Sequence, residues 1–143
     1  MASTAEIAQR WVDALNGRAD PDFAQVFPEH VELWHCYQPE AMDFDGALLG
    51  SMMPTDEARF KQLMSDYRVE NEELFISENG FALTRTILGT LSGGEAINFP
   101  CCTVVTVDDG KIVKIHAYLD HEQHLPLQRA IMEQMAADQA QPS

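Results

Sequence analysis

The chain has 143 residues, 45% of them hydrophobic, which is enough for one domain with a substantial core. Its 23 acidic and 9 basic residues give a formal charge of −14, which disfavours nucleic acid and anionic membranes as partners. Without a long apolar run, and with a polar, helical N-terminus, neither a membrane span nor a signal peptide is expected. Three cysteines, two of them adjacent, do not suggest a disulfide framework, so we expect a reducing, cytoplasmic location.

Two helices are predicted before the first strand. A capping box at residues 3–6 opens the first helix, apolar residues follow at helical spacing, and the Asn-Gly pair at 16–17 ends it. The Asp-Pro pair at 20–21 predicts a second helix, because a polar cap precedes a proline at the first helical position. Pro28 ends that helix.

A strand is predicted at residues 31–37, and its alternation orients its side chains. Leu33 and His35 point to one side, whereas Trp34 points to the other. The next segment, residues 38–54, contains so many prolines and glycines that we expect a loop without regular structure. Its apolar residues indicate that the loop covers another part of the molecule.

The second half of the chain predicts one more helix and then a sheet. The helix starts at Thr55, and its buried face is expected to hold Phe60, Leu63, Met64 and Tyr67. Turn signals separate four further strands, at residues 68–77, 81–91, 96–107 and 111–119. With the first strand they predict an α+β fold, a strongly curved, mostly antiparallel sheet with helices on one side. We expect residues 1–125 to form this domain and residues 126–143 a C-terminal tail, helical over 126–140.

These patterns together resemble one known family. The stretches IAQRWVDALN and VELWH, the Asp-Pro restart at 20–21, and the YLD triplet at 118–120 after the Asp-Gly hairpin at 109–110 are similar to the nuclear-transport-factor-2-like superfamily. Its members include steroid delta-isomerases, limonene-epoxide hydrolases, scytalone dehydratases and SnoaL-like polyketide cyclases. The resemblance covers roughly residues 4–121. It implies a cone-shaped sheet with three helices on its concave face, a cavity there that forms the site, and a homodimer.

The resemblance makes His35 the main candidate for a catalytic residue. It stands where the steroid isomerases have an aspartate base and where the epoxide hydrolases have an asparagine that holds water. A histidine with a pKa of about 6.5 can accept and return a proton near neutral pH. The alternative is a hydrogen-bonded core histidine. Asp43 and Asp45 would support His35 if their loop folds over the cavity, and Glu40 is a weaker candidate; the alternative is that they are solvated acids.

The other groups of the family's sites are absent. Trp11 occupies the position of the isomerase tyrosine and is expected to be a pocket wall. The second isomerase donor falls on Cys102 in one register and on Cys101 in another, and a slip of one residue exchanges the sheet faces. The epoxide-hydrolase triad would fall on Ala117, Leu88 and Thr86, which cannot perform that chemistry.

A cluster of histidines near the end of the sheet raises the question of a metal site. His116, His121 and His124 lie close in sequence to Glu122. However, their spacing does not match HExxH, and Pro126 follows too soon for the long helix that this motif requires. We therefore expect neither a metal site nor a cofactor.

The function expected from these residues is proton transfer on a small apolar molecule. His35 would act next to the carbonyl of a polyketide-like substrate, giving isomerisation, cyclisation or dehydration. The alternatives are a non-catalytic module for ligand binding or dimerisation, with Trp34 and Tyr118 on the outer face of the sheet, and a hydrolase using water held by His35. The expected pocket lining is Trp11, Leu33, Met52, Met53, Leu63, Met64, Cys101, Cys102, Ala117 and Leu119.

Overall fold

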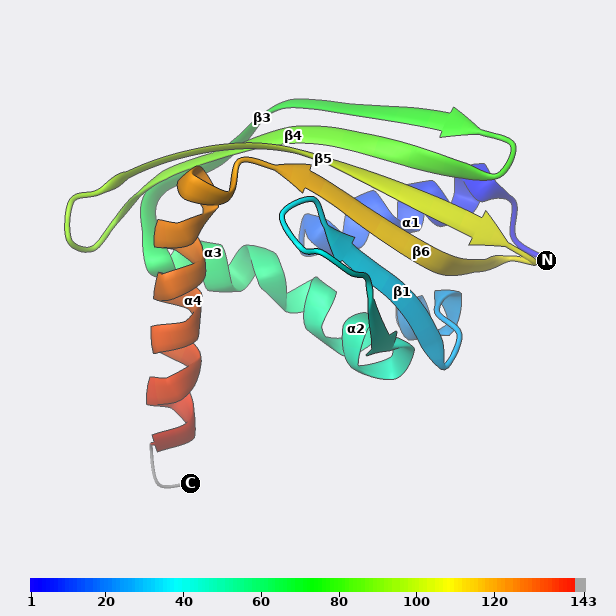
Figure 1. Ribbon diagram of the computed structural model, residues 1–143, viewed down its shortest axis with the longest axis horizontal. Helices are drawn as coiled ribbons and strands as arrows, with labels where there is room; N and C mark the ends of the chain where they lie inside the picture. The colour runs from blue at the N-terminus through cyan, green and yellow to red at the C-terminus, as the bar shows by residue number, and fades with distance from the viewer. Residues whose placement is uncertain (141–143) are drawn as a thin grey trace.

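A curved six-stranded sheet, with helices on one side, organises the computed structural model, which describes residues 1–140 (Figure 1). The strands are β1 (His30–His35), β2 (Met42–Asp45), β3 (Met64–Ser77), β4 (Gly80–Leu91), β5 (Ala96–Asp108) and β6 (Lys111–Leu119). The α-helices are α1 (Thr4–Leu15), α2 (Gly46–Met52), α3 (Asp56–Leu63) and α4 (His121–Ala140), and the 3-10 helices are η1 (Phe23–Val26) and η2 (Met53–Thr55). The expected α+β fold is confirmed.

The strand order is β2-β1-β6-β5-β4-β3. β1 runs parallel to β6, and all other neighbouring strands are antiparallel. The pairing aligns Arg85 of β4 with Cys101 of β5 and then with Leu119 of β6. One row further, Ala117 of β6 pairs with His35 of β1. These residues belong to the face of the sheet that meets the helices, which we call the inner face.

Two groups of buried side chains cover the inner face. The larger joins α1 and η1 to the sheet, with Ile7, Trp11 and Phe23 packed against side chains such as Leu83. The smaller lies at the other end of β4 and consists of Met64, Ile87, Ile97, Phe99 and Leu127, the last contributed by α4. Figure 1 shows the first three α-helices beneath the sheet and α4 projecting from its end. No helix within residues 1–140 combines the length and apolar character that crossing a membrane requires.

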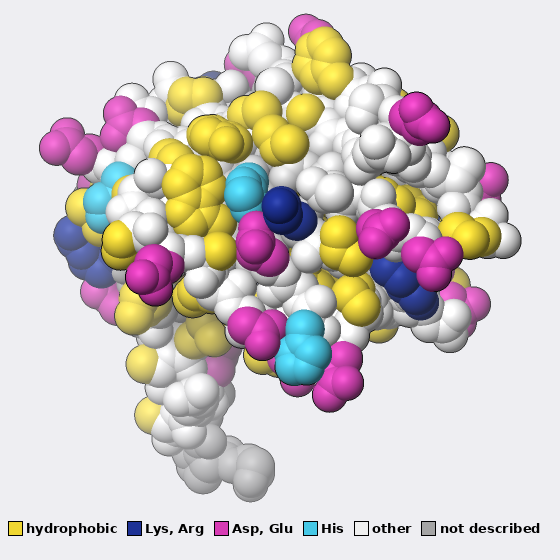
Figure 2. Space-filling view, turned by 45° about the vertical axis from the view of Figure 1, so that its right-hand side comes forward, with side chains coloured by type: hydrophobic (Ala, Val, Ile, Leu, Met, Phe, Trp, Pro, Cys, Tyr) yellow, Lys and Arg dark blue, Asp and Glu magenta, His cyan; other side chains and the backbone are white. Residues whose placement is uncertain are grey.

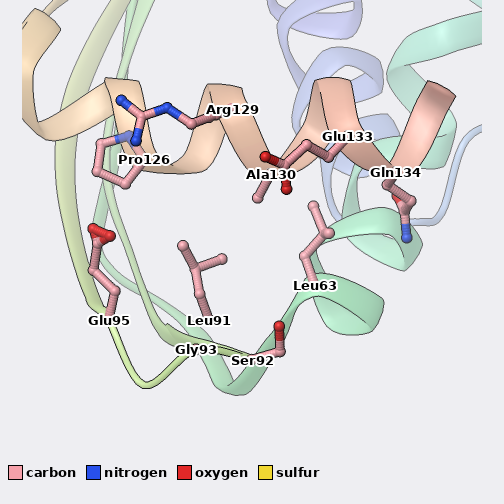
Figure 3. A pocket seen from close by; sticks show the side chains of 10 residues that line it. All are labelled: Leu63, Leu91, Ser92, Gly93, Glu95, Pro126, Arg129, Ala130, Glu133 and Gln134. Atoms are coloured by element: carbon pink, nitrogen blue, oxygen red, sulfur yellow. The ribbon is translucent and has the colours of Figure 1, made fainter. Parts of the chain in front are cut away.

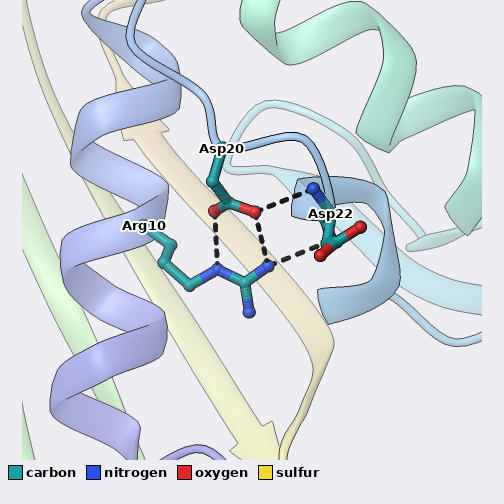
Figure 4. A network of polar contacts seen from close by, with 3 residues as sticks. All are labelled: Arg10, Asp20 and Asp22. Atoms are coloured by element: carbon teal, nitrogen blue, oxygen red, sulfur yellow. Dashed lines mark hydrogen bonds and ion pairs between the residues drawn. The ribbon is translucent and has the colours of Figure 1, made fainter.

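The predicted second helix is present only as the short 3-10 helix η1, which begins later than the Asp-Pro pair suggests. Arg10 of α1 donates to Asp20 from Nε (2.7 Å) and Nη2 (3.0 Å), and to the Asp22 carbonyl from Nη2 (3.0 Å) (Figure 4). The Asp20 carboxylate also accepts the Asp22 N–H at 2.9 Å. The hydrogen bond from Arg10 lowers the pKa of Asp20. Asp20 is therefore an anchor to α1 and the start of a tight turn, rather than a helix cap.

The prediction of a structureless loop at residues 38–54 is wrong. β2 pairs with β1, and Asp45 then caps α2 by accepting the Leu48 N–H at 3.1 Å. The glycines in this segment serve close packing instead of turns. A Cβ on Gly46 would lie 1.7 Å from the Pro28 carbonyl oxygen, and one on Gly50 would lie within 2.8 Å of Ala24.

The boundaries of the third predicted helix and of the tail differ from expectation. α3 ends at Leu63, so that Met64 and Tyr67 belong to β3 rather than to the helix. α4 begins at His121 and continues through Pro126, which corrects the argument that this proline prevents a long helix. Asp120 caps its start, because its carboxylate accepts the N–H of Glu122 at 2.9 Å. The predicted tail residues 141–143 lie outside the described residues.

Candidate functional site

A buried arginine occupies the inner face between the two core groups. Arg85 is 6% exposed, and it alternates along β4 with the buried side chains of Leu83 and Ile87. Its Nε and Nη1 atoms have no hydrogen-bond partner among the described residues. Because buried donor atoms without partners are costly, these two atoms of Arg85 mark this part of the inner face as unusual.

Three titratable side chains surround Arg85, each from a different element. Burial raises the pKa of the Asp56 carboxyl, on α3, from 3.8 to about 6, although the positive charges of Arg59 and Arg85 lower it. Burial also raises the pKa of the Tyr67 hydroxyl on β3 and of the Cys101 thiol on β5, and the charge of Arg85 again opposes both shifts. The charge of Arg85 thus acts on groups from three neighbouring elements.

His35 lies across the inner face from Arg85, at the end of β1. Its side chain is partly buried, and its backbone N–H donates to Oε1 of Gln38 at 2.9 Å. The ring nitrogen Nδ1 lies 3.4 Å from the same oxygen, and the ring centroid lies 5.6 Å from that of Tyr37. His35 is therefore positioned by its own turn, with its ring on the side of the sheet that the helices cover.

Two histidines from the start of α4 adjoin this end of the site. The His124 ring stacks on Phe99 with centroids 4.8 Å apart, and the His121 ring lies 4.0 Å from Tyr37. Burial lowers the pKa of His124 to about 4, with further contributions from the charges of His35 and His121. His124 is therefore neutral at pH 7, and its buried Nδ1 has no partner among residues 1–140. The same residues contain no group of three or more side chains arranged to hold a metal ion.

The two aspartates predicted to support His35 have other partners in the structure. Asp43 lies on β2 and pairs with His30, whose Nδ1 is 3.1 Å from its carboxylate. Asp45 caps α2. Both carboxylates thus serve the segment that follows β1 rather than the imidazole at its end.

The structure decides which of the two adjacent cysteines faces inward. Cys101 packs against the smaller core group and pairs with Arg85. Cys102 pairs with Thr84 and Tyr118 and lies on the opposite, outer face of the sheet. The sequence is compatible with either cysteine facing inward. Because adjacent residues of a strand point to opposite faces, the pairing of β5 with β4 assigns Cys101 to the inner face and Cys102 to the outer face.

The remaining predicted lining residues divide between the core, the inner face and the surface. Trp11 is buried in the larger core group, where its Nε1 has no partner among the described residues. Met52 is 41% exposed and lies on the surface of α2. The others are buried or partly buried and belong to the two core groups or to the inner strand faces: Leu33, Met53, Leu63, Met64, Ala117 and Leu119.

Sequence reasoning missed Arg85. The comparison with the epoxide hydrolases placed their arginine on Thr86, which is one residue away and points to the outer face. The signal that could have identified Arg85 is the apolar alternation of β4 at Phe81, Leu83 and Ile87, because Arg85 is the one charged residue in that series.

A separate groove of about 590 Å³ lies between α4 and the turn that joins β4 to β5 (Figure 3). Leu63 and Leu91 line its apolar part, while Glu95, Arg129 and Glu133 contribute charged groups. It differs from the cavity that the sequence predicted, which would lie on the inner face around His35.

The partly buried carboxyl of Asp56 has a testable effect on stability. Its folded-state pKa lies above its ordinary value, so its contribution to stability is present below pH 4 and is lost as pH rises through about 6. We expect the free energy of unfolding of Asp56→Asn, relative to that of the wild type, to rise by about 2 kcal/mol as the pH is raised from 4 to 8, measured by urea unfolding. Asp138→Asn, at an exposed position of α4, is the control and should follow the wild type. A pH-independent difference would contradict the burial of this charge.

Comparisons with known proteins agree with the fold. The family model described as a SnoaL-like domain matches residues 8–115. A steroid delta-isomerase from Pseudomonas aeruginosa superposes with a TM-score of 0.68 at 10% identity, covering 99% of this chain and 97% of that one. An NTF2-like protein from Burkholderia thailandensis E264 gives 0.63 at 18% identity, with coverage of 90% and 97%.

A further solved structure points the same way. A proposed polyketide cyclase from Pseudomonas putida KT2440 gives a TM-score of 0.62 at 15% identity, covering 88% of this chain and 98% of that one. Among curated proteins, no sequence matches this chain. At these identities, the solved structures show a shared fold.

Proposed function

The chain belongs to the SnoaL-like domain family, and from this premise we propose that it is an enzyme that moves a proton on a small apolar carbonyl compound, with His35 as the general base. The reaction class is isomerisation, cyclisation or dehydration of a polyketide-like molecule. The family and its isomerase and cyclase neighbours support the class of reaction.

The observation that carries this proposal is the position of His35 on the inner face, with a neutral histidine of α4 nearby. His35 projects from the inner face at the end of β1, and His124 is close enough for their charges to interact. In the proposed step, His35 takes the proton from the carbon next to the carbonyl, and the electron pair of that C–H bond moves toward the carbonyl oxygen. His124, which is neutral at pH 7, adds no positive charge that would oppose protonation of His35.

Exchange of carbon-bound protons tests this proposal without knowledge of the net reaction. Cyclohexanone, 2-tetralone and a cyclic β-keto ester are incubated with the protein in D2O, and deuterium incorporation is followed by NMR. We expect incorporation next to the carbonyl of at least one compound above the rate in buffer. If compounds bind, as seen by saturation-transfer NMR, but none exchanges faster than in buffer, the proposal of proton transfer fails.

One contact favours a second candidate, a module that binds a ligand without converting it. The Nδ1 atom of His35 lies 3.4 Å from Oε1 of Gln38, so the chain itself offers this imidazole a partner. In addition, the positions corresponding to the hydrolase carboxylates hold Leu88 and Ala117. Binding without exchange in the experiment above is the result that this candidate requires.

We also propose that two copies pair through the outer face of the sheet. The Trp34 ring lies 5.1 Å from that of His116 and 5.6 Å from that of Tyr118, which is 46% exposed, and Val104 is exposed on the neighbouring strand. Figure 2 shows a side of the molecule where hydrophobic side chains gather beside histidine and charged side chains. An apolar surface shared by two identical chains suits a symmetric interface.

The oligomeric state tests this pairing. Light scattering is expected to give the mass of a dimer for the wild type and of a monomer for Tyr118→Glu, because a charge would have to be buried without a partner. Met132→Glu, on the exposed part of α4, is the control and should remain dimeric. A monomeric wild type, or a dimer that persists in Tyr118→Glu, would rule out this interface.

A further inference from the structure

Arg85 is a buried cation with incomplete neutralisation. Nine-tenths of its surface is covered, and its Nε and Nη1 atoms lack partners among the described residues. Charged side chains in protein interiors are normally paired and hydrogen-bonded, because their desolvation is costly. An arginine in this state at the centre of an inner sheet face therefore calls for a partner from outside the chain.

The groups around Arg85 do not supply enough negative charge. Burial raises the pKa of Tyr67 and of Cys101 above their ordinary values, so both side chains are neutral at pH 7. Asp56 is the acid whose pKa the positive charge of Arg85 lowers, and the charge of Arg59 lowers it as well. Two positive charges thus face one carboxyl group.

This local balance is opposite to that of the whole chain, whose formal charge is −14. Nη1 of Arg59 donates a hydrogen bond to Oε1 of Gln134 at 3.0 Å. Because an amide is neutral, this contact does not balance the charge of Arg59. One net positive charge at the site matches one negative charge on a ligand. A monoanion therefore fits better than a dianionic phosphate.

We propose that Arg85 binds the carboxylate of a small apolar ligand. The guanidinium group offers planar, always charged donors that match carboxylate oxygens. The inner face around it is apolar, with Leu83 and Ile87 on either side along β4, and suits the hydrocarbon part of such a ligand.

This inference also narrows the substrate class, and in that respect it rests on the proposed function. Arg85 on β4 and His35 on β1 are separated by three strand spacings, roughly 14 Å along the sheet, and both belong to its inner face. A ligand held at Arg85 by its carboxylate and reacting at His35 next to a carbonyl is an apolar keto acid.

The test compares two ligands of the same shape and different charge. Binding of 4-phenylbutanoate and of its neutral amide to the full chain is measured by calorimetry at pH 7. We expect the wild type to bind the carboxylate about tenfold more tightly than the amide, or better, and Arg85→Gln to lose this preference. Arg68→Gln, which changes an exposed arginine on β3, is the matched control and should keep the preference. Inorganic phosphate should compete weakly.

A measurement on the wild type guards against a variant that does not fold. On titration with 4-phenylbutanoate, the side-chain Nε–H resonance of Arg85 should shift, whereas the amide should leave it in place. Equal binding of the two probes to the wild type, or a preference that survives in folded Arg85→Gln, would overturn the proposal. Proton exchange tests the proposed function, and carboxylate preference tests the role of Arg85. Because the two are measured separately, failure of one proposal can be told from failure of the other.

Discussion

Replacing His35 by alanine is expected to lower protein-dependent deuterium incorporation into the responsive ketone by about 100-fold or more, because a positioned general base contributes that much. The side chain of His35 is partly buried at the end of a strand. Among the described residues it forms no ion pair, so we do not expect it to anchor the fold. We therefore expect the free energy of unfolding to change by less than about 1 kcal/mol, as for most partly exposed positions.

A histidine at the other end of the same strand provides the control. His30 is exposed and contacts Asp43, so His30→Ala should leave the exchange rate unchanged. A glutamine separates a catalytic role from a positioning role, since its amide can form hydrogen bonds but cannot take a proton from carbon, and His35→Gln should therefore lose the exchange as His35→Ala does. Exchange that continues at the wild-type rate in folded His35→Ala would end the proposal of a histidine base.

Replacing Leu127 by alanine is expected to lower the free energy of unfolding by about 2 to 5 kcal/mol, the range for a buried leucine. Leu127 is 1% exposed and packs on the paired residues Ile87 of β4 and Phe99 of β5. It is the one fully buried residue of α4 among those described. The loss should appear in urea unfolding of the full chain.

The same helix contains a matched control. Met132 is 63% exposed, so Met132→Ala should change the free energy of unfolding by less than about 0.5 kcal/mol. If Leu127→Ala lowers the free energy of unfolding no more than the control does, then the packing of α4 on the sheet does not depend on Leu127. Because His124 is on the first turns of α4, its stacking on Phe99 should weaken together with the helix.

The long strands could be predicted because their limits are encoded locally. Asn79-Gly80 and Asp109-Gly110 are strong turn signals, and the latter pair takes positive φ angles of 51° and 74°. The strand at 111–119 matches the structure at both ends. The short elements between β1 and α3 could not be predicted, because Gly46 permits a close approach to Pro28 that exists only in the folded chain.

The candidate site could be predicted in part. Strand alternation placed His35 on the same side as Leu33, which packs against the larger core group. It could not decide between Cys101 and Cys102, since this depends on the register between β4 and β5. Arg85 was missed for the same reason, because an error of one residue transfers a strand position from the inner to the outer face.

The parallel pairing of β1 with β6 also has a consequence for folding kinetics. Contacts across it, such as that between Glu32 and His116, join residues 84 positions apart, and closing so long a segment is entropically costly. The hairpins of β3 to β6 are local and can form early, whereas β1 must wait for the last strand of the sheet. During synthesis, His35 therefore leaves the ribosome early but reaches its place late. Until then the edge of β6 exposes unpaired backbone groups, and the partly folded chain is at its most vulnerable to aggregation.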